Sequence, residues 1–442
     1  MAARIRKLLG LLDARERRLF AGLFGLMVLM GLASLIGVAS VLPFLAVLAD
    51  AEGASDSPWA APVRAVLGEA VGGSPVGLAA LAVTLYLGAI AVKAGTGYAI
   101  AVFGAERGYT ISNRMMRAYL AQDYPWILDR QVTDAVRTVT GESMQAVNGG
   151  LLPLLNAMAH AIMTTFLLAL LMLVDPVIAL GVAALTGLFY VALNRVVRGR
   201  QHRIGVVRLD ANRKRFRVVG ESFRSFKEIK VAGLERVALA RFRREARRTA
   251  DVSPQVFLVN QAPRFAVEAM MLIGMVGVLL WLLWSREGRI AEILPVAGVY
   301  ALAGSRIAPA MQQVYGGLSQ IRTTGATIDY VAEELARHER GELPPPPAEP
   351  IRLEARIALE GVRFVYPESG PRAALDGLDL ELPARRSIGV VGGTGAGKTT
   401  LVDVILGLFA PQQGVLSVDG RPIRSEEERR AWRASVGYVP KQ

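Results

Sequence analysis

The stretch VVGGTGAGKTT, from Val390 to Thr400, decides the fold of the C-terminal part of this chain. It matches the pattern G-x-x-x-x-G-K-[ST], in which glycines keep side chains away so that backbone N–H groups can close on phosphate. The residues that follow, TLVDVILGL, have helical spacing, and a helix N-terminus favours the same anion. The apolar run Ser387–Val391 predicts the strand that this pattern requires before the loop.

The residue types in this loop predict ATP and Mg²⁺ as cofactors. Lys398 is expected to reach the β- and γ-phosphates, and the Thr399 hydroxyl is expected to bind Mg²⁺. The residues predicted to contact the nucleotide are Gly392, Gly393, Thr394, Gly395, Ala396, Gly397, Lys398, Thr399 and Thr400.

The composition of the whole chain predicts a membrane protein. Of its 442 residues, 52% are hydrophobic, and the mean hydropathy of +0.36 is too high for an ordinary soluble protein. The absence of cysteine excludes disulfides and thiolate metal sites. Six apolar stretches are each long enough to cross a hydrocarbon layer of about 30 Å. They are Leu19–Leu48, Val76–Phe103, Gly149–Val174, Val177–Val197, Phe257–Trp284 and Ile290–Gly316.

The charges between these stretches predict the orientation. The link Asp50–Ser74 holds one arginine against four acidic residues, whereas Arg195–Phe257 holds 18 Lys and Arg against 6 Asp and Glu. Basic links favour the cytoplasmic side, so both termini are expected there, in a multi-pass protein of the inner (plasma) membrane. This distribution explains the net charge of +13 without nucleic acid, because base-stacking aromatic residues are not interleaved with the arginines.

Helical spacing extends beyond the apolar stretches. The basic segment Met1–Arg18 predicts a helix on an anionic membrane surface, or alternatively a solvated tail. The links Glu106–Val147 and Gln201–Ser253 also show helical spacing, so the spans are expected to continue into the cytoplasm. Near their turns, Tyr124–Asp134 and Phe223–Gly233 mix aromatic and charged residues, which fits a helix touching a partner as well as a solvated hairpin.

A second domain is expected after these helices. The proline-rich segment Gly341–Pro350 marks the boundary, which gives a membrane domain over 1–330, a linker over 331–356 and a nucleotide domain over 357–442. Alternating residues predict strands over Ile357–Tyr366 and Leu375–Leu382. Two further elements are predicted, a hairpin over Gly414–Arg421 with its turn at Asp419-Gly420 and a strand over Ser435–Val439.

Six spans with cytoplasmic extensions, a linker, a strand, a phosphate loop and a helix together resemble a subunit of the ATP-binding cassette (ABC) exporters. The resemblance implies an all-α transmembrane domain followed by an incomplete α/β P-loop NTPase domain, working as a homodimer in the lipid bilayer. It implies that Tyr366 stacks on adenine, although an aromatic residue at a strand end also packs on a sheet. It also implies that the two mixed stretches are coupling helices, which relay motion of the nucleotide domain.

The sequence departs from the family pattern near its end. In GYVPKQ, Lys441 follows the proline where the family has glutamine, so Gln442 is the candidate sensor of Mg²⁺ and the γ-phosphate. The signature segment, the acidic Walker B segment and the switch histidine are not present in the 442 residues. We therefore expect an ABC transporter ATPase from the longer gene product, and no hydrolysis by these residues alone. A non-transporting regulatory subunit that binds nucleotide is the alternative from another class.

Charged residues inside the spans indicate the substrate, because they are costly in lipid. Three cations, Lys93, Arg264 and Arg306, are expected to line a cavity with Glu268 and to hold an anionic group. Alternatively, Arg264 and Glu268 neutralise each other and Lys93 snorkels to the interface. His160 is expected to form an interhelical hydrogen bond.

The segment before and within the first span, which ends in Pro43-Phe44, resembles exporters that flip lipid-linked oligosaccharides. That resemblance implies a polyprenyl-pyrophosphate cargo, with lipid A, peptide or drug export as alternatives.

Overall fold

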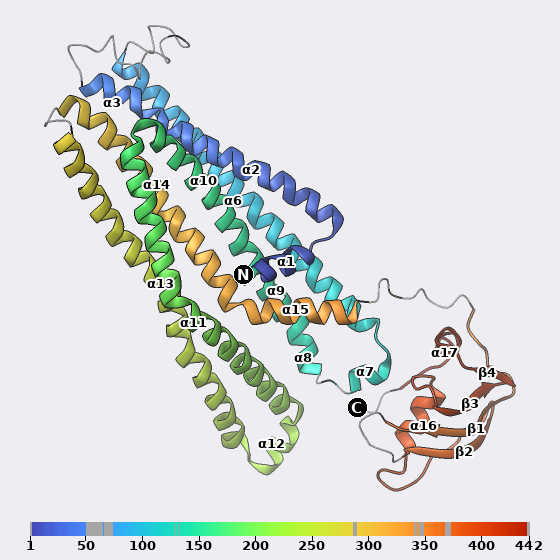
Figure 1. The fold of residues 1–442 in the computed structure, drawn as a ribbon. Coiled ribbons are helices and arrows are strands. Elements are labelled where there is room, and N and C mark those ends of the chain that lie inside the picture. Colours follow the sequence, from blue (N-terminus) through green and yellow to red (C-terminus); the bar gives the residue numbers. More distant parts are fainter. Residues whose placement is uncertain are drawn as a thin grey trace. The chain divides into compact units, whose positions relative to one another are not determined.

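The structure, a computed structural model, describes residues 2–49, 65, 74–128, 130, 132–285, 290–339, 343, 349–366 and 373–439. The chain divides into two compact units. The first comprises residues 1–116 and 136–337, and the second comprises residues 117–135 and 338–442. The first is built of helices, and the second contains the sheet (Figure 1).

The helical part of the chain contains long helices joined by short ones (Figure 1). In chain order they are α1 (Ala2–Gly10), α2 (Ala14–Ala39), α3 (Val41–Ala49), α6 (Pro75–Leu120), α7 (Tyr124–Leu128), α8 (Val132–Arg137), the π-helix η1 (Thr138–Glu142), α9 (Ser143–Ala146), the π-helix η2 (Val147–Leu151), α10 (Leu152–Val174), α11 (Pro176–Arg224), α12 (Phe226–Ala232), α13 (Glu235–Ser285), α14 (Ile290–Thr323) and α15 (Gly325–His338).

Each of the six apolar stretches falls on helix. Over the described residues, three helical segments are long and apolar enough to cross a membrane: Ala14–Leu48, Pro75–Leu120 and Val132–Val174. A shorter apolar segment covers Glu268–Trp281. The first segment consists of two helices, because the chain departs from helix at Ser40 between α2 and α3.

The predicted helical extensions are confirmed. Helices α6, α11 and α13 have 46, 49 and 51 residues. At about 1.5 Å per residue, each is more than twice as long as the hydrocarbon layer is thick. The two mixed stretches contain the short helices α7 and α12, as expected. Gly233 ends α12 at φ +64°, a left-handed conformation that favours glycine.

The N-terminal segment differs from the single amphipathic helix predicted over Met1–Arg18. Helix α1 ends at Gly10, and α2 begins only after Asp13, whose backbone N–H donates to the Glu16 carboxylate at 2.9 Å. The apolar side chains of Leu8, Leu11 and Leu12 are buried within the protein. The apolar face of this segment is therefore covered by the protein rather than left for lipid.

The basic side chains of α1 also contact the protein. The Arg4 and Lys7 side chains bind Asp329 on α15 at 3.2 and 2.9 Å, and Lys7 also binds Glu333 at 3.0 Å. These ion pairs hold α1 on α15, whose acidic residues lie more than 300 positions away in the sequence.

The sheet of the second unit has four strands in the order β2-β1-β3-β4, all antiparallel. They are β1 (Arg356–Phe364), β2 (Leu375–Pro383), β3 (Gln413–Val418) and β4 (Arg421–Ile423). Helices α16 (Lys398–Ile405) and α17 (Glu426–Arg433) belong to the same unit (Figure 1). The buried face of the sheet packs with both helices in one apolar core that includes Leu359, Val362, Phe409 and Trp432. The two strands predicted before the loop and the Asp419-Gly420 hairpin are confirmed.

Two other predicted strands do not form. Ser387–Val391 and Ser435–Val439 have no strand partner among the described residues, and most of their apolar side chains are exposed, up to 92% for Val391 and 90% for Val439, whereas Val436 packs against the core. A strand needs a neighbour to complete its backbone hydrogen bonds. Their apolar character predicted strands, but the described sheet offers no edge that pairs with them.

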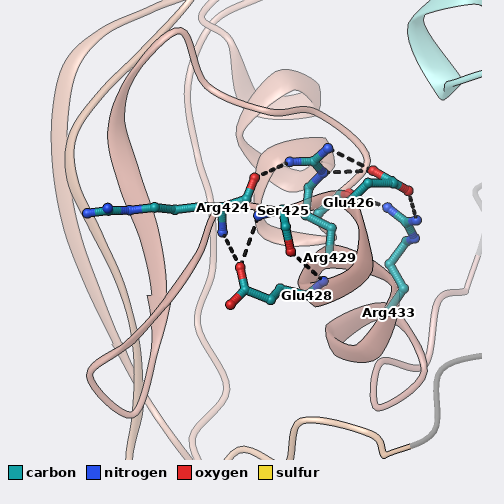
Figure 2. A network of polar contacts seen from close by, with 7 residues as sticks. Arg424, Ser425, Glu426, Glu428, Arg429 and Arg433 are labelled. Carbon is teal, nitrogen blue, oxygen red and sulfur yellow. Dashed lines mark hydrogen bonds and ion pairs between the residues drawn. The ribbon is translucent and has the colours of Figure 1, made fainter.

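Helix α17 is held by a polar network at its N-terminus (Figure 2). The Glu428 N–H donates to the Ser425 hydroxyl at 3.1 Å, and the Glu428 carboxylate accepts from the Arg424 and Ser425 N–H groups at 2.9 Å. The Glu426 carboxylate forms ion pairs with Arg429 and Arg433. The first and last turns of the eight-residue helix are thus tied together.

This network predicts a pH dependence. Burial alone would raise the pKa of Glu426, but hydrogen bonds from Arg433 and Arg429 lower it below its ordinary value. A lowered pKa means that the stabilisation is present above the ordinary value of 4.5 and is lost as the pH falls through the folded value. We expect Glu426→Gln to lower the free energy of unfolding at pH 7, measured by thermal unfolding, by less than about 1 kcal/mol, because Glu426 is half-exposed. The difference from wild type should shrink below pH 4.5, and a constant difference over this range would contradict the prediction.

Candidate nucleotide and substrate sites

The phosphate loop has the backbone that its glycines predict. Gly395 and Gly397 have φ angles of +83° and +80°, which side chains disfavour. A Cβ on Gly397 would also lie 2.5 Å from the Ala374 carbonyl oxygen, so the loop approaches the start of β2 closely. Gly397 precedes α16, which begins at Lys398 with its N–H groups facing the loop. The loop and the helix terminus therefore have a backbone that fits an anion, and phosphate binding by these residues stays a prediction.

Lys398 already lies across this loop. Its Nζ donates to the carbonyl oxygens of Gly392 and Gly393 at 2.8 and 2.7 Å. An ammonium group has three donors, so one remains for a phosphate oxygen. The residues present therefore fit a nucleotide: the loop N–H groups and Lys398 would hold its phosphates.

The two threonines of the loop differ in environment. Thr399 is exposed, as a Mg²⁺ ligand must be, whereas Thr400 is buried. The Thr400 hydroxyl lies 3.1 Å from the Tyr366 hydroxyl. Thr400 therefore has its backbone N–H available for phosphate. Its side chain connects α16 to Tyr366, which follows the end of β1. No pattern in the sequence indicates this contact.

Tyr366 belongs to a group of four aromatic rings. It packs edge-on against Phe364 and Phe409, with ring centroids 5.1 and 5.6 Å away, and Phe364 stacks on Phe409 at 4.5 Å. Tyr124 on α7 contacts the other end of the group, 5.7 Å from Phe409. Adenine stacking on Tyr366 stays a prediction. The group connects that candidate base site to the first short helix of the same unit.

Gln442 and Lys441 lie outside the described residues, so the candidate γ-phosphate sensor stays a prediction. The described part of the chain holds no group of three or more His, Cys, Asp or Glu residues that could bind a metal. The predicted Mg²⁺ site depends instead on the Thr399 hydroxyl together with nucleotide phosphates.

The first unit brings together two cations and a histidine from three helices. Lys93 on α6 interacts electrostatically with Arg306 on α14 and with His160 on α10. The Arg306 guanidinium lies 4.5 Å above the ring of Tyr86, also on α6. Among the described residues, no carboxylate pairs with Lys93 or Arg306. We call Lys93, His160 and Arg306 the cation cluster.

The remaining predicted substrate residues lie on α13. Glu268 is exposed, and the side chain of Arg264 lies outside the described part of the structure. The proposed Arg264–Glu268 pair therefore stays a prediction. For His160, the hydrogen bond found is within α10, from Nδ1 to the Asn156 carbonyl oxygen at 2.9 Å, rather than between helices as predicted. The sequence does not indicate that His160 is a neighbour of Lys93, because the two residues belong to different helices.

Comparisons with known proteins give a family match and a structural match. Residues 375–442 match the family described as "ABC transporter". Over 94% of its length, the chain superposes on 71% of a bacterial Atm1-family ABC exporter solved with ATP bound, with a TM-score of 0.64 and 19% sequence identity. At 19% sequence identity, this similarity establishes a shared fold and nothing further.

Two curated relatives show sequence similarity. The chain is 26% identical over 279 residues to "ABC transporter ATM1" of Toxoplasma gondii, covering 59% of this chain and 24% of the relative. It is 27% identical over 300 residues to an "ATP-dependent lipid A-core flippase" of Chromohalobacter salexigens, covering 65% of this chain and 48% of the relative. The chain thus spans less than half the length of these relatives.

The helical unit has helices long and apolar enough to cross a membrane, and the second unit carries the phosphate loop. More specifically, residues 375–442 match the ABC transporter family, and the chain has the fold of an ABC exporter half-transporter.

Proposed function

We propose that this chain is the membrane domain, with part of the nucleotide domain, of an ATP-driven exporter of lipid-linked, anionic substrates. The observation that carries the substrate class is the cation cluster. Ionisable groups inside a membrane are costly and face a cavity or a partner. A phosphate or pyrophosphate would neutralise Lys93 and Arg306, which have no acidic partner among the described residues.

A lipid-linked oligosaccharide is the first candidate, because its polyprenyl chain suits the bilayer and its pyrophosphate suits the cation cluster. Lipid A is the second candidate, favoured by the relative named "ATP-dependent lipid A-core flippase". Both substrates combine apolar chains with phosphate, so the cluster alone supports the shared chemistry.

The transporter would be a homodimer with both termini in the cytoplasm. The turn between α11 and α12 supports an interface there, because Phe223 at the end of α11 and Phe226 at the start of α12 stack at 6.3 Å and Phe223 is 72% exposed. ATP binding would draw two nucleotide domains together, α7 and α12 would transmit that closure, and ATP hydrolysis would reset the cavity.

Binding measurements in nanodiscs test the substrate class. We expect the chain to bind a polyprenyl pyrophosphate more tightly than the uncharged polyprenol. Lys93→Gln and Arg306→Gln should each weaken binding of the pyrophosphate about tenfold, because each removes a charged partner. Lys227→Gln, on the exposed surface of α12, is the matched control and should have no effect.

The same series with lipid A ranks the two candidates. Equal binding of the polyprenol and the pyrophosphate, or unchanged binding in both cation-cluster variants, would show that the cluster does not recognise the anion.

A further inference from the structure

The C-terminal end of α16 is held by side chains of α17. A helix leaves its last four carbonyl oxygens without partners inside the helix. The indole N–H of Trp432 donates to the Ile405 carbonyl oxygen at 2.7 Å, and the Arg433 guanidinium donates to the Gly407 carbonyl oxygen. A cation at a helix C-terminus also interacts favourably with the helix dipole. We call these two hydrogen bonds the α16–α17 contact.

The partners in this contact are themselves fixed. Trp432 is buried in the core of the second unit, and Glu426 holds the second nitrogen of the Arg433 guanidinium (Figure 2). Gly407 has a φ of +67°. It lies close to Trp432, because a Cβ added at Gly407 would be 3.4 Å from the indole ring. The α16–α17 contact therefore joins the C-terminal end of α16 to α17, whose side chains are held in place.

The N-terminal end of α16 borders the phosphate loop. Its N-terminus is Gly397, and the residues before the loop, 387–391, form no strand and are exposed among the described residues. What holds α16 is therefore its buried face, the Tyr366–Thr400 contact and the α16–α17 contact. An eight-residue helix is only about 12 Å long, so a displacement at one end moves the other.

We propose that Trp432 and Arg433 are positioning residues for the nucleotide phosphates. By fixing the C-terminal end of α16, they set the position of the N–H groups and of Lys398 at its N-terminal end. This inference rests on the proposed function, because it requires nucleotide to bind at the phosphate loop. It assigns a role at the phosphate site to residues on the far side of the helix, which touch no phosphate themselves.

The test uses the full chain in nanodiscs, with inorganic tripolyphosphate and ATP as probes. Trp432→Phe keeps a smaller aromatic ring and removes the indole N–H, and Arg433→Gln removes the cation. We expect affinity for tripolyphosphate to fall about fivefold in the first variant and about tenfold or more in the second. Arg433→Lys keeps a charged donor and should recover part of the loss. Arg430→Gln is the matched control, because it removes the same charge from the same helix without touching α16.

A role limited to stability would lower the melting temperature and leave the affinity of the folded fraction for tripolyphosphate unchanged. That result in both Trp432→Phe and Arg433→Gln would overturn the inference, and so would an equal loss in Arg430→Gln. If instead the wild-type chain bound neither probe, or Lys398→Ala bound ATP like wild type, the proposed nucleotide site itself would be wrong.

Discussion

Replacing Lys398 with alanine is expected to lower the affinity of the chain for ATP by at least about a hundredfold. A hydrogen bond between a charged donor and a phosphate contributes about 1.5 to 3 kcal/mol, and the positive charge of Lys398 also attracts the neighbouring phosphates. Lys398 already lies on the loop, with its Nζ on the Gly392 and Gly393 carbonyl oxygens, so little rearrangement is needed to reach a nucleotide.

Equilibrium binding of ATP to the chain in nanodiscs measures this effect. Membrane insertion should not change, because Lys398 belongs to the second unit. Lys227→Ala, an exposed lysine on α12, removes an equal charge elsewhere and should bind ATP like wild type. An affinity of Lys398→Ala within twofold of wild type would mean that the loop does not hold the phosphates.

Replacing Arg137 with leucine is expected to have the largest effect on stability. The Arg137 guanidinium and the Glu142 carboxylate lie 2.6 Å apart, with side chains only 3% and 4% exposed. They are five residues apart across the π-helix η1, whose hydrogen bonds follow the same i to i+5 spacing. Removing the cation leaves a buried carboxylate without its charge partner, which costs about 3 to 5 kcal/mol.

Thermal unfolding in nanodiscs measures this loss. The double variant Arg137→Leu, Glu142→Leu should recover most of the stability, because it removes both buried charges together. The matched control is the exposed pair Asp210 and Lys214 on α11, whose disruption should cost less than about 1 kcal/mol. If Arg137→Leu cost no more than Lys214→Leu, the buried pair would not support the fold as described.

Much of the fold was predictable because its signals are local. The apolar stretches and their helical extensions follow from spacing along one helix, and the Asp419-Gly420 turn follows from its own residues. The phosphate loop was predictable for the same reason, since Gly395, Gly397 and Lys398 act within a few residues of one another.

The contacts that the sequence missed connect distant parts of the chain. Nothing near Arg4 or Lys7 indicates Asp329, so the basic α1 was assigned to lipid. The neighbours of Lys93 depend on how α6, α10 and α14 pack, which periodicity does not determine.

The strands predicted over 387–391 and 435–439 failed because strand formation requires a partner and apolar character alone does not supply one. The contribution of Trp432 had one local signal, a single large apolar residue in the otherwise polar helix EEERRAWR.

Photolabelling with 8-azido-ATP tests most directly whether the phosphate loop and Tyr366 form one nucleotide site. The chain in nanodiscs would be labelled, digested and analysed by mass spectrometry to find the modified peptide. We predict label on the peptide that contains Tyr366, displaced by excess ATP and absent from Lys398→Ala. Label on peptides outside residues 357–442, at the same level in wild type and Lys398→Ala, would contradict a nucleotide site at this loop.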